Sequence, residues 1–208
     1  MPTEAKAPRG MPTFLGAATR YILAEGRERA HERGDVMRGF ILGVAAVILL
    51  GVVGAYAILR SGLVPANADA RPGGLEVWAA NTSLSATLRR EAPKGANPVA
   101  LTDDHLTEGV KLYAGHCAIC HGTAAGDASA SPVAKGLYPK PPQLASDGVE
   151  DDAEGVTYWK IRHGIRLTGM PSWAGSLNDN QIWTLALFLK HMDKLPPHAQ
   201  QAWRQVTN

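Results

Sequence analysis

The sequence has few cysteines and no concentration of basic residues. Its two cysteines, Cys117 and Cys120, stand close together in a chain of 208 residues. A disulfide-stapled domain normally shows several pairs at wider spacings, so the sequence is not that of a disulfide scaffold. Thirteen of the 21 Lys and Arg residues and fourteen of the 19 Asp and Glu residues follow Arg60, which leaves this larger part of the chain close to neutral. Nucleic-acid-binding proteins carry a clustered basic surface, so the sequence excludes that class.

Charge is absent from one long apolar run, residues 39–59. A helix of this length extends about 31 Å at about 1.5 Å per residue, close to the roughly 30 Å hydrocarbon core of a bilayer. A buried core helix rarely stays uncharged on every face over such a length. A cleaved signal peptide has a shorter apolar stretch and fewer residues before it. The run therefore predicts a membrane-spanning helix over residues 39–59.

Positive charge is unequal on the two sides of this run. The arginines within about twenty residues of it, the distance over which flanking charge sets orientation, are Arg20, Arg27, Arg29, Arg33 and Arg38 before it and Arg60 and Arg71 after it. Since positively charged flanks stay in the cytoplasm, the sequence predicts a single pass with residues 1–38 cytoplasmic and the carboxy-terminal part outside. Within residues 1–38, apolar residues at helical spacing from Phe14 to Ile22 allow a short helix on the inner leaflet or on a partner subunit, or else a frayed charged tail.

Residues 60–101 are rich in Gly, Pro, Ala, Asn and Ser, with repeated prolines and glycines that break helices. This composition predicts a tether on the periplasmic side. Between the breaks, residues 75–91 could form one short helix through Trp78, Leu84 and Leu88. The tether leads into a predicted domain at residues 102–195, and a tail at residues 196–208 follows the domain.

A motif of two cysteines and a histidine lies near the start of this domain. Cys117, Cys120 and the adjacent His121 form a Cys-x-x-Cys-His run, the attachment site of a c-type haem. Thiols one helical turn apart can each form a thioether with a haem vinyl group, and the imidazole then projects toward the iron. A thioredoxin-type dithiol also uses Cys-x-x-Cys but expects a βαβ setting, and a zinc site needs two further ligands at suitable spacing. The sequence offers neither of these.

An electron carrier generally closes the far side of the iron with Met or His. Two methionines follow the apolar run: Met170, in a Gly-Met-Pro loop that could turn its thioether inward, and Met192, at the end of an amphipathic stretch. The remaining histidines stand in or beside predicted helices without comparable turn residues; they are His105, His116, His163, His191 and His198. The sequence therefore predicts one haem c, attached through Cys117 and Cys120, with His121 and Met170 as the iron ligands.

Helical patterns account for the rest of the domain. Thr102 and two acidic residues open a helix that runs into the cysteine motif, residues 157–163 form a short helix ended by Gly164, and Asn178 opens a last long helix. No stretch alternates apolar and polar residues as a strand does. The predicted fold class is all-α, with a single N-terminal transmembrane helix and a small helical domain.

Over residues 102–195 the sequence resembles the class I cytochrome c family in its membrane-anchored bacterial, single-haem form. The resemblance rests on Gly109 and Tyr113 in the first helix, on the Cys-Ala-Ile-Cys-His run, on the Gly-Met-Pro loop and on the apolar and aromatic face of the last helix. It implies a cytochrome c-type helical domain around one covalent haem. It also implies that the first and last helices cross near Gly109 and an aromatic residue of the last helix.

The resemblance further implies which residues surround the haem. The family places a proline carbonyl against the free nitrogen of the axial histidine, where it fixes the imidazole and tunes the iron. Pro141 and Pro142 are favoured over Pro139 for this role, and a rigid extended connector is the alternative for the segment. The residues that could meet the haem propionates are Arg162, Arg166, Tyr158 and Trp173.

These features predict an electron-transfer protein without substrate chemistry of its own, which passes single electrons by Fe(III)/Fe(II) cycling. The expected partners are the lipid bilayer of a bacterial inner membrane and redox proteins in or at it, and the chain is expected to be a subunit or docked partner of a respiratory or dehydrogenase complex. The near-neutral outer domain predicts docking by short-range contacts rather than by long-range charge. The alternatives are a haem enzyme or a gas or peroxide sensor with a labile Met170, and an anchored thiol oxidoreductase with free cysteines.

Overall fold

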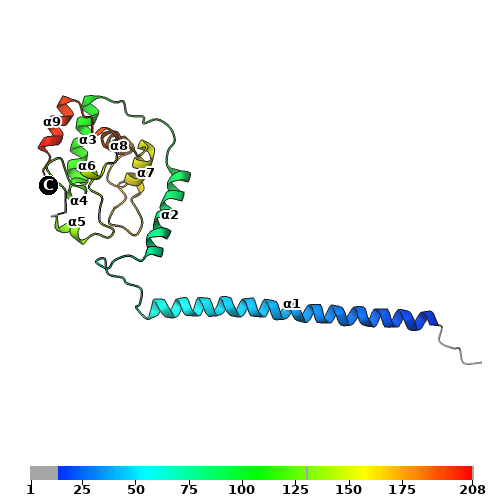
Figure 1. Ribbon diagram of the computed structural model, residues 1–208. Helices are drawn as coiled ribbons and strands as arrows, with labels where there is room; N and C mark the ends of the chain where they lie inside the picture. The colour runs from blue at the N-terminus through cyan, green and yellow to red at the C-terminus, as the bar shows by residue number, and fades with distance from the viewer. Residues whose placement is uncertain (1–13, 130, 208) are drawn as a thin grey trace, which may run out of the picture. The chain divides into compact units, whose positions relative to one another are not determined.

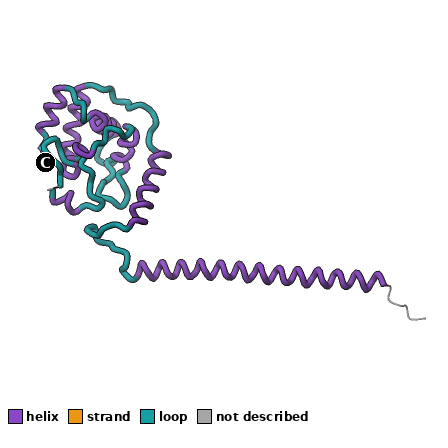
Figure 2. The backbone as a smooth tube through the Cα atoms, in the orientation of Figure 1, coloured by secondary structure: helices purple, strands orange, loops and turns teal. Residues whose placement is uncertain are grey.

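The computed structural model describes residues 14–129 and 131–207. As predicted, the chain is helical over this described part, which contains no β-strand (Figure 2). The chain divides into two compact units between Pro65 and Ala66. One long helix makes up most of the described first unit, and the second unit contains all the other described helices (Figure 1).

Helix α1 (Phe14–Arg60) contains the predicted membrane span. Its portion Arg33–Arg60 is long and apolar enough to cross a membrane, and this candidate span includes the predicted run at residues 39–59. The helix extends back to Phe14 because Ala, Glu and Arg, which are good helix formers, are frequent before the span. The side chains of residues 14–22, on which the predicted inner-leaflet helix depends, lie outside the described residues.

Helix α2 (Gly74–Glu91) occupies the region in which the sequence predicts a short helix within the tether. It belongs to the second compact unit, where Leu84 and Leu88 are half-buried. The amino end of the helix is open to solvent, with Leu75 and Trp78 exposed.

The chain after α2 is attached to the helical domain. The Asn97 side-chain amide donates hydrogen bonds to Glu154 Oε1 at 2.9 Å and to the Trp183 carbonyl at 3.1 Å. The Pro93 carbonyl lies so close to Gly155 that a Cβ atom there would come within 2.0 Å of it. The compact unit therefore begins well before residue 102, where composition alone places the start of the domain.

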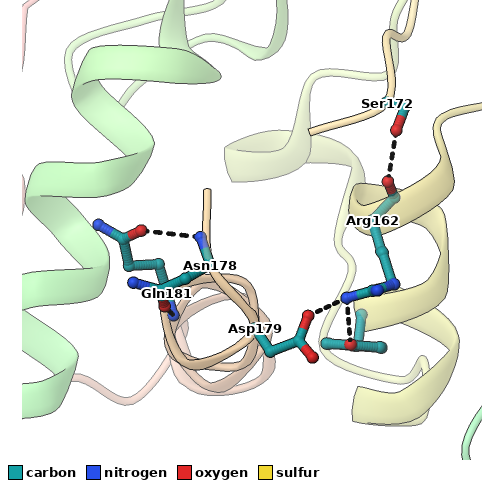
Figure 3. A network of polar contacts seen from close by, with 6 residues as sticks. Arg162, Ser172, Asn178, Asp179 and Gln181 are labelled. Atoms are coloured by element: carbon teal, nitrogen blue, oxygen red, sulfur yellow. Dashed lines mark hydrogen bonds and ion pairs between the residues drawn. The ribbon is translucent and has the colours of Figure 1, made fainter. Parts of the chain in front are cut away.

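The other helices of the second unit follow in chain order. They are α3 (Asp103–His116), α4 (Ala118–His121), α5 (Pro132–Gly136), α6 (Leu144–Asp147), α7 (Glu154–His163), α8 (Asp179–His191) and α9 (Pro197–Gln205). The predicted caps are present: the Thr102 hydroxyl accepts from the His105 N–H at 3.2 Å. Asn178 and Gln181 exchange hydrogen bonds of 3.0 Å at the start of α8, forming a capping box (Figure 3). These caps fix where α3 and α8 begin.

The core of the domain is the crossing of α3 and α8. At Gly109 a Cβ atom would lie 2.5 Å from Phe188 Cβ and 3.0 Å from the Thr184 carbonyl oxygen, so only glycine permits this approach. The crossing is the one that the family resemblance implies. It buries Val110, and it leaves Phe188 fully inaccessible to solvent.

Helix α9 completes this core, although the sequence predicts only a tail at residues 196–208. Trp203, on α9, is 7% exposed and packs edge-on against Tyr113 and Phe188, with ring centroids 5.4 and 5.3 Å away. The Ala199 N–H donates to Asp103 Oδ1 at 2.8 Å, which ties the start of α9 to the start of α3. The helix is short and carries two buried residues, Ala199 and Trp203, on one face.

We predict that Gly109→Ala lowers the free energy of unfolding by about 1–3 kcal/mol, because the added methyl group overpacks the α3–α8 crossing. Gly115→Ala is the matched control on the same helix, since a Cβ atom there meets nothing within 4 Å. That control is expected to gain about 0.5–1 kcal/mol from helix propensity. Urea titrations followed by circular dichroism measure both values, and equal stability of the two variants would contradict the prediction.

Candidate functional site

The two cysteines and His121 share one tight helical turn. Helix α3 ends at His116, and the N–H groups of Cys120 and His121 both donate to the Cys117 carbonyl, at 3.1 and 3.0 Å. Both cysteines are half-buried and unpaired, and Cys117 packs against the hydrophobic core. The two thiols are thus one helical turn apart and next to the imidazole. Attaching one haem through its two vinyl groups requires this spacing.

The thiols are poorly suited to dithiol redox chemistry. Burial raises the pKa of the Cys117 thiol to about 12, with the neighbouring Cys120 acting in the same direction. Burial also raises the pKa of Cys120. Since the thiolate is the reactive form, a pair of this kind would attack a disulfide slowly at neutral pH. This disfavours the thiol oxidoreductase alternative.

A zinc site finds no support in the described part of the chain. No group of three or more His, Cys, Asp or Glu side chains there is placed to hold a metal ion. Zinc sites need at least three protein ligands.

A backbone carbonyl orients the His121 ring. His121 Nδ1 lies 2.8 Å from the Pro142 carbonyl oxygen. Because a carbonyl can only accept, Nδ1 carries the proton in this contact, and Nε2 keeps its lone pair free for a metal. Burial lowers the pKa of His121, which favours the neutral ring, while the hydrogen bond to Pro142 acts in the opposite direction. Of the two favoured prolines, Pro142 therefore faces the ring, and the Pro141 carbonyl accepts instead from Gln143.

Gln143 connects the cysteine motif to the proline segment. Its side-chain amide donates to the Cys120 carbonyl at 3.2 Å and to the Pro141 carbonyl at 2.9 Å, and its Oε1 accepts from the Ala128 N–H at 2.6 Å. The same oxygen lies 3.0 Å from where a Cβ atom of Gly122 would stand. One side chain thus fixes the carbonyl of Pro141 relative to the turn that carries His121.

The turn is also fixed from the core side. The buried Tyr113 hydroxyl donates to the Gly122 carbonyl at 2.9 Å. Gly122 has φ +77°, a left-handed conformation that favours glycine, and it directly follows His121. The position of the imidazole is therefore coupled to the aromatic cluster of α3, α8 and α9.

Met170 lies in a loop that returns to the end of α7. The Met170 carbonyl accepts from the Ile165 N–H at 3.2 Å, and the Met170 N–H donates to Thr168 Oγ1 at 3.1 Å. Met170 itself is half-buried and packs against the same core cluster as Cys117. Met170 and Cys117 thus border the same core cluster.

Of the four residues predicted to meet the haem propionates, Trp173 and Arg162 are placed differently from each other. Trp173 is half-buried and packs edge-on against His116, with ring centroids 5.1 Å apart. The Arg162 guanidinium pairs with Asp179 and donates to the Tyr158 hydroxyl at 3.1 Å (Figure 3). A propionate contact from Arg162 would compete with this ion pair, and the haem contacts of Arg162 and Trp173 remain predictions.

The donor set fits a covalently attached haem. Two thiols on one turn can hold its vinyl groups, the imidazole offers Nε2, and a thioether is available from Met170. Cys117, Cys120, His121 and Met170 are each half-buried, so each keeps part of its surface available to a bound group. The residues that sequence reasoning missed are Gln143 and Gly122, which act through hydrogen bonds and backbone conformation rather than through a motif.

The match to a known family falls on this region. Residues 104–189 match the family model described as "Cytochrome C oxidase, cbb3-type, subunit III". A solved chain of the Kuenenia stuttgartiensis reducing HAO-like protein complex Kustc0457/Kustc0458 is similar at 21% sequence identity, with a TM-score of 0.37. The similarity covers 50% of this chain and 52% of that one, so the present chain matches about half of that chain's length. No curated protein sequence matches the chain.

We predict that Gln143→Ala lowers the free energy of unfolding by about 1–3 kcal/mol, because it leaves partly buried backbone groups without partners. Gln200→Ala, at an exposed position of α9, is the control and should stay within about 0.5 kcal/mol of the parent. Urea titrations of both variants test this. An unchanged Gln143→Ala midpoint would mean that water replaces the amide without cost.

Proposed function

We propose that this chain, whose residues 104–189 form a class I c-type cytochrome domain, passes single electrons through one covalently bound haem while α1 anchors it in a membrane. The observation that carries the proposal is the turn on which Cys117, Cys120 and His121 stand together, with the imidazole held by the Pro142 carbonyl. The chain itself is not proposed to transform a substrate, although it could serve a larger oxidoreductase as a subunit.

Each residue of the site has a separate role in this proposal. Cys117 and Cys120 hold the group through thioethers, so that a small domain retains it without enclosing it. His121 would bind the iron through Nε2, and the Pro142 carbonyl keeps the ring in its orientation. Met170 would be the second protein ligand of the iron, through its thioether. When bound, the haem contributes reversible Fe(III)/Fe(II) chemistry, and a Met ligand raises its potential relative to two His ligands.

The surface near the proposed ligands supports docking by apolar contacts. Ile119, between the two cysteines, is 55% exposed, and Leu167, three residues before Met170, is 91% exposed. Leu167 also has φ +61°, a backbone conformation that is unfavourable for a branched residue. Because its side chain is exposed, packing does not explain this conformation. Because the unit around them is close to neutral, a redox partner would be recognised here by short-range contacts.

The location in this proposal is a bacterial inner membrane. Its support is the candidate span Arg33–Arg60 together with the excess of arginines before residues 39–59. The helical domain would then lie on the periplasmic side, where a membrane-bound or membrane-associated respiratory or dehydrogenase complex could donate and accept electrons.

The haem proposal predicts a specific optical signature of the purified full-length protein. Pyridine haemochrome analysis should give one haem per chain, and the oxidised form should show the weak far-red Met-to-iron band. Met170→Ala should keep the haem but lose this band and bind carbon monoxide when reduced. Met192→Ala, the control at a buried core position, should keep the band and exclude carbon monoxide even where it lowers stability. Haem without the far-red band in the parent would favour the enzyme or sensor alternative, and absence of haem would contradict the proposal.

The orientation predicts which end of the chain a protease can reach. In spheroplasts of cells that produce the full chain, added protease should remove a carboxy-terminal tag and leave an amino-terminal tag intact. Detergent lysis should expose both tags. Protection of the carboxy-terminal tag in spheroplasts would reverse the proposed orientation, and release of the chain by alkaline carbonate would contradict the membrane anchor.

A further inference from the structure

The carboxyl end of α7 presents backbone carbonyls that no residue of the helix itself can bind. The chain just after Met170 binds them. The Trp173 N–H donates to the Ile161 carbonyl at 3.2 Å, and the Ala174 N–H donates to the Arg162 carbonyl at 3.2 Å. The Arg162 carbonyl also accepts from Ser172 Oγ at 2.7 Å (Figure 3). Because these contacts satisfy the helix end, the segment that follows Met170 is attached to α7.

Gly164, the C-cap residue of α7, lies directly against the backbone of Met170 and Pro171. It is buried and has φ +66°. A Cβ atom at Gly164 would lie 2.6 Å from the Met170 carbonyl oxygen and 2.6 Å from the Pro171 carbonyl carbon. These are backbone atoms, so no side-chain rotation can relieve the contact. A residue larger than glycine must displace the Met170–Pro171 peptide.

We infer that Gly164 is the positioning residue for the Met170 ligand. Its missing side chain lets the loop close on the end of α7, and the closed loop fixes the backbone from which the thioether projects. Ser172 contributes to the same closure through its hydrogen bond to the Arg162 carbonyl. This inference rests on the proposed function, in which Met170 binds the haem iron.

The other glycines of this region lack this property. At Gly169 a Cβ atom would approach Leu137 Cδ2, the end of a flexible side chain that can move away. At Gly175 it would meet nothing within 4 Å. Gly175→Ala therefore adds the same methyl group a few residues beyond Met170 without moving the loop, which makes it the matched control.

The experiment compares Gly164→Ala with Gly175→Ala in the full-length haem protein. The parent and Gly175→Ala should show the far-red Met-to-iron band and exclude carbon monoxide when reduced. Gly164→Ala should keep one haem per chain but lose the band and bind carbon monoxide. Retention of the band and exclusion of carbon monoxide by Gly164→Ala would overturn the inference. Absence of the haem or of the band from the parent itself would instead overturn the proposed function.

If Gly164→Ala does not fold, Ser172→Ala tests the same inference, because this substitution adds no atom to the loop. In a urea titration, loss of the far-red band should move to a lower urea concentration than in the parent, while loss of the helical signal should keep the parent's midpoint. Equal shifts of the two signals, or no shift of either, would mean that the contact stabilises the fold without positioning Met170, and would overturn the inference.

Discussion

The close approach of α3 and α8 at Gly109 is the contact on which the rest of the domain depends. With Phe188 packed on the glycine, the Tyr113 ring lies 5.5 Å from that of Phe188, and Trp203 closes the third side. The Tyr113 hydroxyl then reaches the Gly122 carbonyl, directly after His121. The packing of α3 on α8 therefore positions Tyr113, and the hydrogen bond of Tyr113 holds the turn that carries His121.

Backbone carbonyls orient both proposed ligands, although in different ways. On the His121 side the Pro142 carbonyl faces Nδ1, and Gln143 holds the adjacent Pro141 carbonyl. On the Met170 side the carbonyls at the end of α7 receive hydrogen bonds from the loop. Backbone carbonyls do not titrate. They have few alternative positions once the backbone that carries them is held in place. The arrangement suits a carrier whose iron ligands should move little between two oxidation states.

Local signals in the sequence predicted most of what lies close together along the chain. The all-α class, the c-type cytochrome domain and the starts of α3 and α8 are confirmed, because each depends on a motif, a cap or a helical period within a few residues. Helix α9 was missed although Pro197 in its first turn and its amphipathic pattern are local helix signals. What the sequence could not show is its place in the core, where Trp203 packs on Tyr113 and Phe188. The pairing of Arg162 with Asp179 and the hydrogen bonds of Gln143 likewise depend on segments brought together only by the fold. The roles of Cys117, Cys120, His121 and Met170 toward haem remain predictions.

The length of chain between the proposed anchor and the domain limits how far the haem could travel. Composition suggests a tether over residues 60–101, which fully extended would span roughly 150 Å at about 3.6 Å per residue. In the structure, α2 and the segment around Asn97 belong to the domain, and only residues 61–73 separate Arg60 from Gly74. That stretch can extend about 50 Å at most. With α1 in a bilayer, the start of α2 would stay within this distance of the end of the span, so an electron partner must be in the membrane or bound close to its surface. Under the proposed anchoring, this short connection would therefore prevent the domain from shuttling freely through the periplasm.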